Sequence, residues 1–261
     1  MLRVAALLTV GVGGEDMRLR ESVALITGAS KGLGLEIARE YAECGARLVI
    51  AARHPEALDR AATELRKKTE VVSVTVDVSQ EAERFVEAGL ERFGRIDVLV
   101  NNASELGPSP MPRLESLSWQ DMEHILRVNV TAPLHLTQLV LRQMRARSTG
   151  VIINVTSDAG VEAYAGWGGY GASKAALEHM SRVLSEELSG SGIRVYVVDP
   201  GDMNTEMHRQ AEPGIDLSGL PGPEVSALAF VRLVEEEVSP FGRFKAQEIA
   251  ALAETTGKGA W

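Results

Sequence analysis

The stretch "VALITGASKGLGLEIAREYAECG", residues 23–45, contains an apolar run, three closely spaced glycines and a helix-like segment in succession. The run "VALIT" is short and apolar, as buried strands are, and apolar residues recur at helical spacing after the glycines. A glycine turn between strand and helix brings backbone N–H groups close to an anion. The spacing of its glycines, G-x-x-x-G-x-G, is by itself only weak evidence of phosphate binding, because a turn between a strand and a helix can need glycine for its backbone geometry alone. In this context it indicates an α/β fold with a phosphate-binding turn.

The same alternation of apolar runs and helical segments continues along the 261 residues. We predict strands at 23–27, 47–52, 71–78, 96–101, 151–157 and 194–199, a further strand within 242–249, and a long helical stretch at 117–147. Near-continuous apolar strands that alternate with helices form parallel sheets covered on both faces. The sequence therefore predicts a single domain over 17–261, with a doubly wound parallel sheet of six to seven strands. Residues 1–16 are expected to be a poorly ordered extension.

Composition argues against several classes of protein. The net charge of −9 disfavours nucleic acid as the main partner, because binding to phosphate backbones needs a basic face. Cys44 is the only cysteine, so no internal disulfide can form and a reducing, cytoplasmic location is expected. The five histidines lack the spacing of metal ligands, so no metal site is predicted. No run of about eighteen apolar residues would span a membrane.

Glycines and polar residues follow every predicted strand at its carboxyl end. In chain order the strands end in "TGASKGLG", Arg53, Asp77-Val78, "NNAS", Ser157 and "DPGDMNT". Ligands of open α/β sheets bind outside the carboxyl ends of the strands, at the point where the strand order reverses. Any one of these residues taken alone fits a turn, but together they predict one ligand-binding crevice.

The end of the second strand bears on the choice of ligand. NAD-binding folds of this kind place an acidic residue about twenty residues beyond the glycines, where it holds the ribose hydroxyls. Here that position reads Ala51-Ala52-Arg53, so no carboxylate repels a 2′-phosphate. Arg53 and Lys31 of the glycine turn offer charge-assisted contacts to such a phosphate. We therefore predict NADP(H) rather than NAD(H); the alternative is that both side chains are solvated surface cations.

Taken together, these motifs resemble the single-domain short-chain dehydrogenase/reductases of about 250 residues. The resemblance covers residues 18–206 and rests on "TGASKGLG", "DV", "NNA", Asn129 in "VNV", Ser157, "YGASK" and "PGDMNT". It implies a Rossmann fold and an NADP-dependent oxidoreductase. It also implies that the cofactor contacts Gly28, Ser30, Lys31, Gly32, Leu33, Gly34, Arg53, Asp77, Val78, Asn101, Asn102, Ala103, Tyr170, Lys174, Pro200, Gly201 and Thr205.

The resemblance further implies a catalytic set of Asn129, Ser157, Tyr170 and Lys174. Tyr170 and Lys174 are four residues apart, so a helix places them on one face. A free phenol has a pKa near 10, and the Lys174 ammonium is expected to favour the phenolate. Tyr170 would protonate the carbonyl oxygen, Ser157 would orient the carbonyl, and Asn129 would anchor a water that relays protons. Ser104 and Asp199 depart from the family pattern of Gly and Asn, and neither is expected to touch the catalytic set.

Several functional alternatives stay open. The Gly- and Pro-rich segment 202–223 resembles a substrate lid. Substrate contacts, or packing of that lid alone, are expected from Met203, Met207, His208, Tyr164 and Trp167. Arg142, Arg145 and Arg147 would suit an acidic carrier protein in a ketoreductase of carrier-bound 3-oxoacyl groups, although a solvated helix face also explains them. Oxidation of an alcohol, or nucleotide sensing without catalysis, are further possibilities.

The resemblance also implies a homodimer or homotetramer formed through the helices at 117–147 and 172–189. Apolar positions on these helices that would permit such contacts are Leu134, Leu136, Leu139, Leu177 and Val183.

Overall fold

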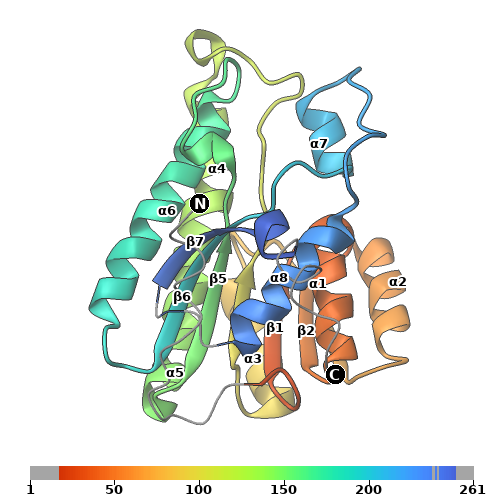
Figure 1. Cartoon of the computed structure of the whole chain (residues 1–261), viewed down its shortest axis with the longest axis vertical. Helices are drawn as coiled ribbons and strands as arrows, with labels where there is room; N and C mark the ends of the chain where they lie inside the picture. The colour runs from red at the N-terminus through yellow and green to blue at the C-terminus, as the bar shows by residue number, and fades with distance from the viewer. Residues whose placement is uncertain (1–17, 237–238, 240, 251–261) are drawn as a thin grey trace.

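The computed structural model describes residues 18–236, 239 and 241–250, and the extension expected at 1–16 lies outside the described residues. A parallel sheet runs through the molecule in the order β3-β2-β1-β4-β5-β6-β7 (Figure 1). Its strands are β1 (Val23–Thr27), β2 (Arg47–Ala52), β3 (Val71–Thr75), β4 (Val98–Asn101), β5 (Gly150–Val155), β6 (Ile193–Asp199) and β7 (Phe241–Lys245). The predicted doubly wound sheet is therefore confirmed, and β7 supplies the seventh strand.

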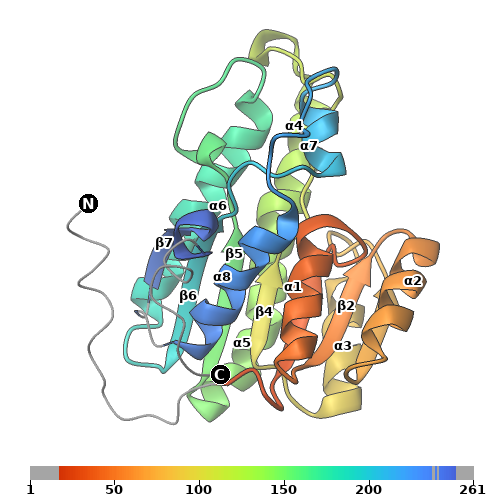
Figure 2. The same cartoon turned by 45° about the vertical axis from the view of Figure 1, so that its right-hand side comes forward.

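Helices cover both faces of this sheet (Figure 2). One face carries α1 (Gly32–Glu43), α2 (Pro55–Leu65) and α8 (Pro223–Glu235), and the other carries α3 (Ala82–Phe93), α5 (Ala132–Arg147) and α6 (Gly168–Glu187). Side chains of β1 alternate between the two cores, with Ala24 and Ile26 in one and Val23 and Leu25 in the other. This alternation follows from the two-residue period of a strand and explains why the apolar runs are continuous.

The long helix expected at 117–147 contains a local widening. Helix α4 (Trp119–Leu126) passes into α5 through a π-helical turn at Arg127–Thr131. Such turns insert one residue into the helical repeat and are frequent at functional sites. Here the turn carries Asn129, whose side chain is buried with 1% exposure.

Helix α7 (Glu206–Ala211) stands apart from the two helical layers, beyond the carboxyl ends of the strands (Figures 1 and 2). It belongs to the segment 202–223 that the sequence suggests as a lid. The backbone N–H of Asn204 donates to the carbonyl of Pro221 at 2.9 Å, so the two ends of this segment meet. Within the described part of the chain, no helix is both long enough and apolar enough to cross a bilayer.

Candidate active site

A cavity of ≈ 610 Å³ opens at the carboxyl ends of the strands. It lies at the switch point, where the chain leaves β3 on one side of β1 and returns through β4 on the other. Most of the predicted site residues line it, and they come from every strand end from β1 to β6: Gly28, Ser30, Lys31, Gly32, Leu33, Arg53, Asp77, Val78, Asn102, Ala103, Ser157, Tyr170, Lys174, Pro200, Gly201 and Thr205. Gly34, Asn101 and Asn129 are absent from the cavity wall.

The glycine turn is bonded to the neighbouring "NNA" turn. Asn102 Nδ2 donates to the carbonyl of Thr27 at 2.8 Å, and Thr27 Oγ1 accepts from the backbone N–H groups of Asn102 and Ala103 at 2.9 Å each. Gly28 has a φ of +67°, and a Cβ there would lie 3.0 Å from the Cα of Ala103. A Cβ on Gly34 would lie 2.4 Å from Asn102 Nδ2. Gly34 therefore serves close packing of the two turns rather than the cavity wall.

Two further predicted residues have structural partners. Asn101 is 3% exposed and its Nδ2 donates to Asn154 Oδ1 at 2.7 Å, which ties β4 to β5 behind the cavity. The Asp77 carboxylate accepts from the backbone N–H and the hydroxyl of Ser79 at 2.9 and 2.7 Å. Burial opposes its charge, yet these bonds and one from Gln80 hold the pKa of Asp77 below its usual value. Asp77 thus fixes the turn in which Val78 reaches the cavity.

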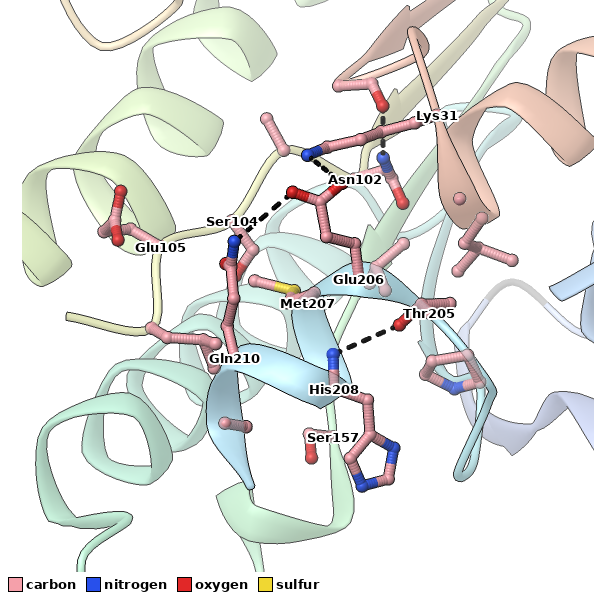
Figure 3. A pocket seen from close by; sticks show the side chains of 18 of the residues that line it. Lys31, Asn102, Ser104, Glu105, Ser157, Thr205, Glu206, Met207, His208 and Gln210 are labelled. Carbon is pink, nitrogen blue, oxygen red and sulfur yellow. Dashed lines mark hydrogen bonds and ion pairs between the residues drawn. The ribbon is translucent and has the colours of Figure 1, made fainter. Parts of the chain in front are cut away.

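Two cations lie at the rim of the cavity, and each faces a glutamate. Lys31 Nζ lies 2.8 Å from Glu206 Oε2 on α7 (Figure 3). Arg53 Nη1 lies 3.6 Å from Glu105 Oε2. Both cationic side chains are more than half exposed. No carboxylate follows Arg53 at the end of β2. The narrow glycine cradle and this pair of reachable cations fit a dinucleotide that carries an additional phosphate.

Tyr170 and Lys174 project from α6 into the cavity and are 8% and 2% exposed. Lys174 Nζ lies 5.3 Å from the centre of the Tyr170 ring and donates to the carbonyl of Val155 at 2.8 Å. Burial lowers the pKa of Lys174 to about 7 and raises the pKa of Tyr170. Burial, together with the carboxylates of Asp199 and Asp158, thus opposes in the chain alone the phenolate that the sequence predicts Lys174 to favour.

Ser157 stands just beyond the end of β5 and lines the same cavity as Tyr170. Its hydroxyl donates to Asp158 Oδ1 at 2.9 Å, while its backbone carbonyl accepts from Arg243 Nη2 at 3.3 Å. Burial opposes the charge of Asp158, but hydrogen bonds from Tyr164, Ser157 and the N–H of Ala159 hold its pKa below the usual value. Ser157 is thus positioned from both sides before any ligand enters.

Behind Ser157 lies a buried cluster of charges. Arg243 of β7 pairs with Glu178 Oε1 at 3.0 Å and with Asp199 Oδ2 at 3.4 Å. Asp199 Oδ1 also accepts from the N–H of Gly201 at 3.0 Å. This cluster holds the Pro200-Gly201 turn and the end of β5 in one arrangement.

The expectation that Ser104 does not touch the catalytic set is wrong. Its hydroxyl donates to Asn129 Oδ1 at 3.1 Å, so Ser104 contacts one member of the predicted catalytic set. Asp199 has no such contact with these residues, but its negative charge contributes to raising the pKa of Tyr170. Asn129 itself lies behind Ser104, out of the cavity.

The substrate end of the cavity is lined by the side chains expected there, with one exception. Met203, Met207, His208 and Trp167 line the wall. Tyr164 is absent from it, and its hydroxyl donates to Asp158 Oδ2 at 2.8 Å instead. The described residues contain no group of three or more His, Cys, Asp or Glu side chains that could hold a metal ion.

Four residues that sequence reasoning missed or set aside contribute to the site: Ser104, Glu105, Asp158 and Glu206. Ser104 and Asp158 each adjoin a motif residue, so the motif boundaries offered a signal for them. Glu105 and Glu206 act through partners far away in the chain, and no local pattern identifies such pairs.

Comparison with known proteins places this geometry in a family. The model of the family described as "short chain dehydrogenase" matches residues 22–216. A rhamnolipid biosynthesis 3-oxoacyl-[acyl-carrier-protein] reductase of Pseudomonas aeruginosa is 38% identical over 198 residues, which cover 72% of this chain and 75% of that protein.

Solved structures agree with this match. A short chain dehydrogenase from Pseudomonas syringae superposes with a TM-score of 0.82 at 28% identity, over 92% of this chain and 100% of that one. One from Shigella flexneri, complexed with NADP, gives a TM-score of 0.79 at 27% identity, over 90% of this chain and 100% of that one. This chain belongs to the short-chain dehydrogenase family of Rossmann-fold oxidoreductases.

Proposed function

We propose that the protein reduces a ketone or aldehyde to an alcohol with NADPH. The observation that carries the proposal is that Tyr170, Lys174 and Ser157 share one cavity with the glycine turn and the two rim cations. An acid–base group, an orienting hydroxyl and a dinucleotide cradle in one crevice are the parts that hydride transfer requires of a protein.

The choice of NADP(H) rests on the rim cations. Backbone N–H groups of the turn from Gly28 to Gly32 would hold the pyrophosphate, and Arg53 and Lys31 would hold the 2′-phosphate. The NADP complex of the Shigella flexneri relative supports this assignment. When bound, the reduced nicotinamide supplies the hydride.

The remaining steps are assigned to side chains of this chain. Tyr170 donates its phenolic proton to the carbonyl oxygen as the alcohol forms. Ser157 fixes the carbonyl beside Tyr170, and the buried Lys174 provides positive charge next to the phenol when it is protonated. Residues Met203 and Met207 and the ring of Trp167 offer an apolar surface to the substrate.

The test is to measure oxidation of NADPH and of NADH by the purified protein against a panel of aldehydes, ketones and diketones. NADPH-linked turnover, faster than NADH-linked turnover with the same substrate, is the expected result. Tight binding of NADPH without turnover of any carbonyl or alcohol would contradict the proposal and favour nucleotide sensing. Alcohols with NADP⁺ should be run alongside, to define the favoured direction.

A ketoreductase of carrier-bound 3-oxoacyl groups is the second candidate, favoured by the name of the Pseudomonas aeruginosa relative. Arg142 and Arg145 are exposed on α5, as an acidic carrier would need. Arg147 is engaged instead with Asp97, at 3.2 Å. Rates with a 3-oxoacyl group on its carrier and with the free ketone separate the two candidates.

We also propose a homodimer or homotetramer in the cytoplasm. Leu134 on α5 and Val183 on α6 are 41% and 46% exposed and would suit an interface, whereas Leu136 and Leu177 are buried in the protomer. Burial raises the pKa of Cys44 to about 11, which disfavours its thiolate at neutral pH. Sedimentation of the full chain tests the oligomeric state.

A further inference from the structure

Arg243, on the edge strand β7, reaches two turns of the cavity wall that follow different strands. Its Nη2 donates to the backbone carbonyl of Ser157 at 3.3 Å and lies 3.4 Å from Asp199 Oδ2 at the end of β6. Asp199 Oδ1 accepts from the backbone N–H of Gly201 at 3.0 Å, so Asp199 connects Arg243 to the Pro200-Gly201 turn. One guanidinium nitrogen is therefore shared between Ser157 and that turn, and both line the cavity.

The guanidinium is itself held by α6. Its Nε donates to Glu178 Oε1 at 3.0 Å, and the same oxygen accepts from Thr156 Oγ1 at 2.8 Å. Glu178 is 5% exposed and lies one helical turn beyond Lys174, which lies one turn beyond Tyr170. The face of α6 that carries the proposed acid–base residues thus continues into the residue that holds Arg243.

The three charges of this cluster are largely removed from water. The side chains of Glu178, Asp199 and Arg243 are 6%, 5% and 22% exposed. Burying charges is costly, and apolar side chains of similar volume often serve stability as well as a complete buried ion pair does. Apolar side chains could fill the same space, but they could not donate to the Ser157 carbonyl or accept from Gly201. The cluster therefore contributes directed bonds to the site that packing alone would not supply.

The two turns that Arg243 joins lie at the end of the cavity where a nicotinamide would bind. Across the sheet, the strand ends follow the order β2, β1, β4, β5 and β6. A dinucleotide with its extra phosphate at Arg53 and its pyrophosphate at the glycine turn after β1 points its other end toward β5 and β6. Ser157 and the Pro200-Gly201 turn lie there. Hydride transfer needs reacting atoms about 3–3.5 Å apart, so the separation of these two turns matters for the rate.

We propose that Arg243 is a positioning residue for hydride transfer: held by Glu178, it fixes the separation between Ser157, which orients the carbonyl, and the Pro200-Gly201 turn beside the nicotinamide. The inference rests on the proposed function. Arg243 is not among the residues that line the cavity, and it exchanges no proton with the substrate. It acts only through Ser157 and Asp199.

The kinetic test is Arg243→Lys, which keeps a positive charge beside Glu178 and Asp199. A lysine replaces the planar fork of the guanidinium by a single ammonium, so it cannot bond Glu178 and the Ser157 carbonyl in the same directions. With a ketone that the wild type reduces, kcat should fall about tenfold to a hundredfold, as expected for a misplacement of about 1 Å between reacting groups. Urea unfolding should show a smaller loss of stability than in Arg243→Met.

Binding measurements separate positioning from a general loss of structure. Adenosine 2′,5′-bisphosphate carries the extra phosphate of NADPH but no nicotinamide, so its Kd should be unchanged in Arg243→Lys. The fluorescence emission of bound NADPH reports the surroundings of the nicotinamide and should change in wavelength or intensity. Equal weakening of both ligands, with NADPH emission as in the wild type, would show a structural role alone and overturn the inference.

Arg194→Lys is the matched control. Arg194 is also partly buried and donates to backbone carbonyls, those of Leu233 and Val234 at 3.4 and 2.8 Å. It lies near the amino end of β6 and does not line the cavity. The kcat of Arg194→Lys and the emission of its bound NADPH should coincide with those of the wild type.

The outcomes distinguish this inference from the proposed function. Wild-type kcat and wild-type NADPH emission in Arg243→Lys would overturn the inference and leave the proposed function intact. A changed emission in a protein that turns over no carbonyl or alcohol would refute the proposed function and support the role of Arg243.

Glu178→Gln is a second variant, for use if Arg243→Lys does not fold. It keeps an oxygen for Thr156 but weakens the charge that holds Arg243. The emission of bound NADPH should change in the same direction as in Arg243→Lys, by a smaller amount. An emission identical to that of the wild type would overturn the inference.

Discussion

Lys31 Nζ lies 2.8 Å from Glu206 Oε2, so an ion pair joins the glycine turn to α7 across the rim of the cavity. Both side chains are more than half exposed, and pairs of this kind contribute about 0.2–1 kcal/mol. A phosphate that binds Lys31 must displace the Glu206 carboxylate. Glu206 therefore competes with the 2′-phosphate of the proposed cofactor for Lys31.

Glu206→Gln should tighten NADPH binding by about twofold to fivefold, because Lys31 is then free before binding. Fluorescence titration at low and physiological salt measures the effect, which should shrink as salt screens the pair. Glu212→Gln is the control, since Glu212 lies on the same segment but pairs with His208 at 3.1 Å. Weaker NADPH binding by Glu206→Gln would show that this carboxylate does not compete for Lys31.

Arg53→Ala should reduce the preference for NADPH over NADH about tenfold to a hundredfold, which corresponds to the loss of a hydrogen bond between charged groups. The ratio of kcat/KM for the two cofactors is the measurement. Arg60→Ala removes an exposed arginine of α2 outside the cavity and should leave the ratio unchanged. If the ratio of kcat/KM for NADPH and NADH is unaltered in Arg53→Ala, the assignment of Arg53 to the 2′-phosphate site is wrong.

Tyr170→Phe should lower carbonyl reduction by at least about 10²-fold, because the acid that protonates the substrate oxygen is gone. The Kd of NADPH should change little, since the phenyl ring still fills the same buried position against Trp167. Comparing stopped-flow hydride transfer with equilibrium binding separates the two effects. Wild-type rates in Tyr170→Phe would refute the assignment of this phenol as the acid.

Arg243→Met should destabilise the fold by about 3–5 kcal/mol, because it leaves Asp199 buried without its cation and Glu178 with only Arg182, whose Nη2 lies 3.9 Å away. The side chains of Glu178 and Asp199 are 6% and 5% exposed. Urea unfolding measures the loss, and Arg84→Met, which breaks an exposed pair with Glu81, should cost less than about 1 kcal/mol. Burial raises the pKa of Asp199, so the loss should shrink as the pH falls and this carboxylate becomes protonated. A small loss at neutral pH would mean that the two carboxylates do not depend on Arg243.

Stability should also depend on pH through Lys174. Its pKa is about 7 in the fold against 10.5 for an ordinary lysine, so between these values the unfolded chain binds more protons than the native one. Native stability therefore rises with pH across that window. Lys174→Met should raise the free energy of unfolding above that of the wild type. This difference should be largest below pH 7 and should decline toward pH 10. Urea unfolding midpoints of the wild type and of Lys174→Met at pH 6, 8 and 10 test this prediction. Lys245→Met, which removes an exposed lysine, is the control. A difference in midpoint between Lys174→Met and the wild type that stays constant with pH would contradict the burial argument.

Much of this fold follows from local pattern. The apolar runs predict the strands because both faces of a parallel sheet are buried, and β1, β2 and β6 begin and end within one residue of the predicted limits. The polar strand ends predict the cavity because parallel strands bring their carboxyl ends to one edge. The π-helical turn at Asn129 was not predictable, since the apolar spacing of 117–147 continues through it.

The details of the site depend instead on pairs that are distant in the chain. Lys31 and Glu206 are 175 residues apart, and Arg243 is 86 residues from Ser157. Such contacts leave no periodic signal, and the burial that shifts the pKa values of Tyr170 and Lys174 exists only in the folded chain. The departure of Ser104 from the family glycine was visible, but its contact with Asn129 required the position of the π-helical turn.

The bond between Asn204 and Pro221 has a consequence for how such proteins diversify. Because its two ends are held together, the excursion between them can change in length or sequence while β6 and α8 keep their register. The excursion carries Met207 and His208 of the cavity wall together with Thr205 and Glu206, the partner of Lys31, whereas Tyr170, Lys174 and Ser157 lie outside it. A change in the excursion would therefore alter the cavity wall and leave the proposed acid–base residues in place. Grafting the excursion from a relative would therefore exchange this part of the cavity wall in one step, together with the carboxylate that faces Lys31.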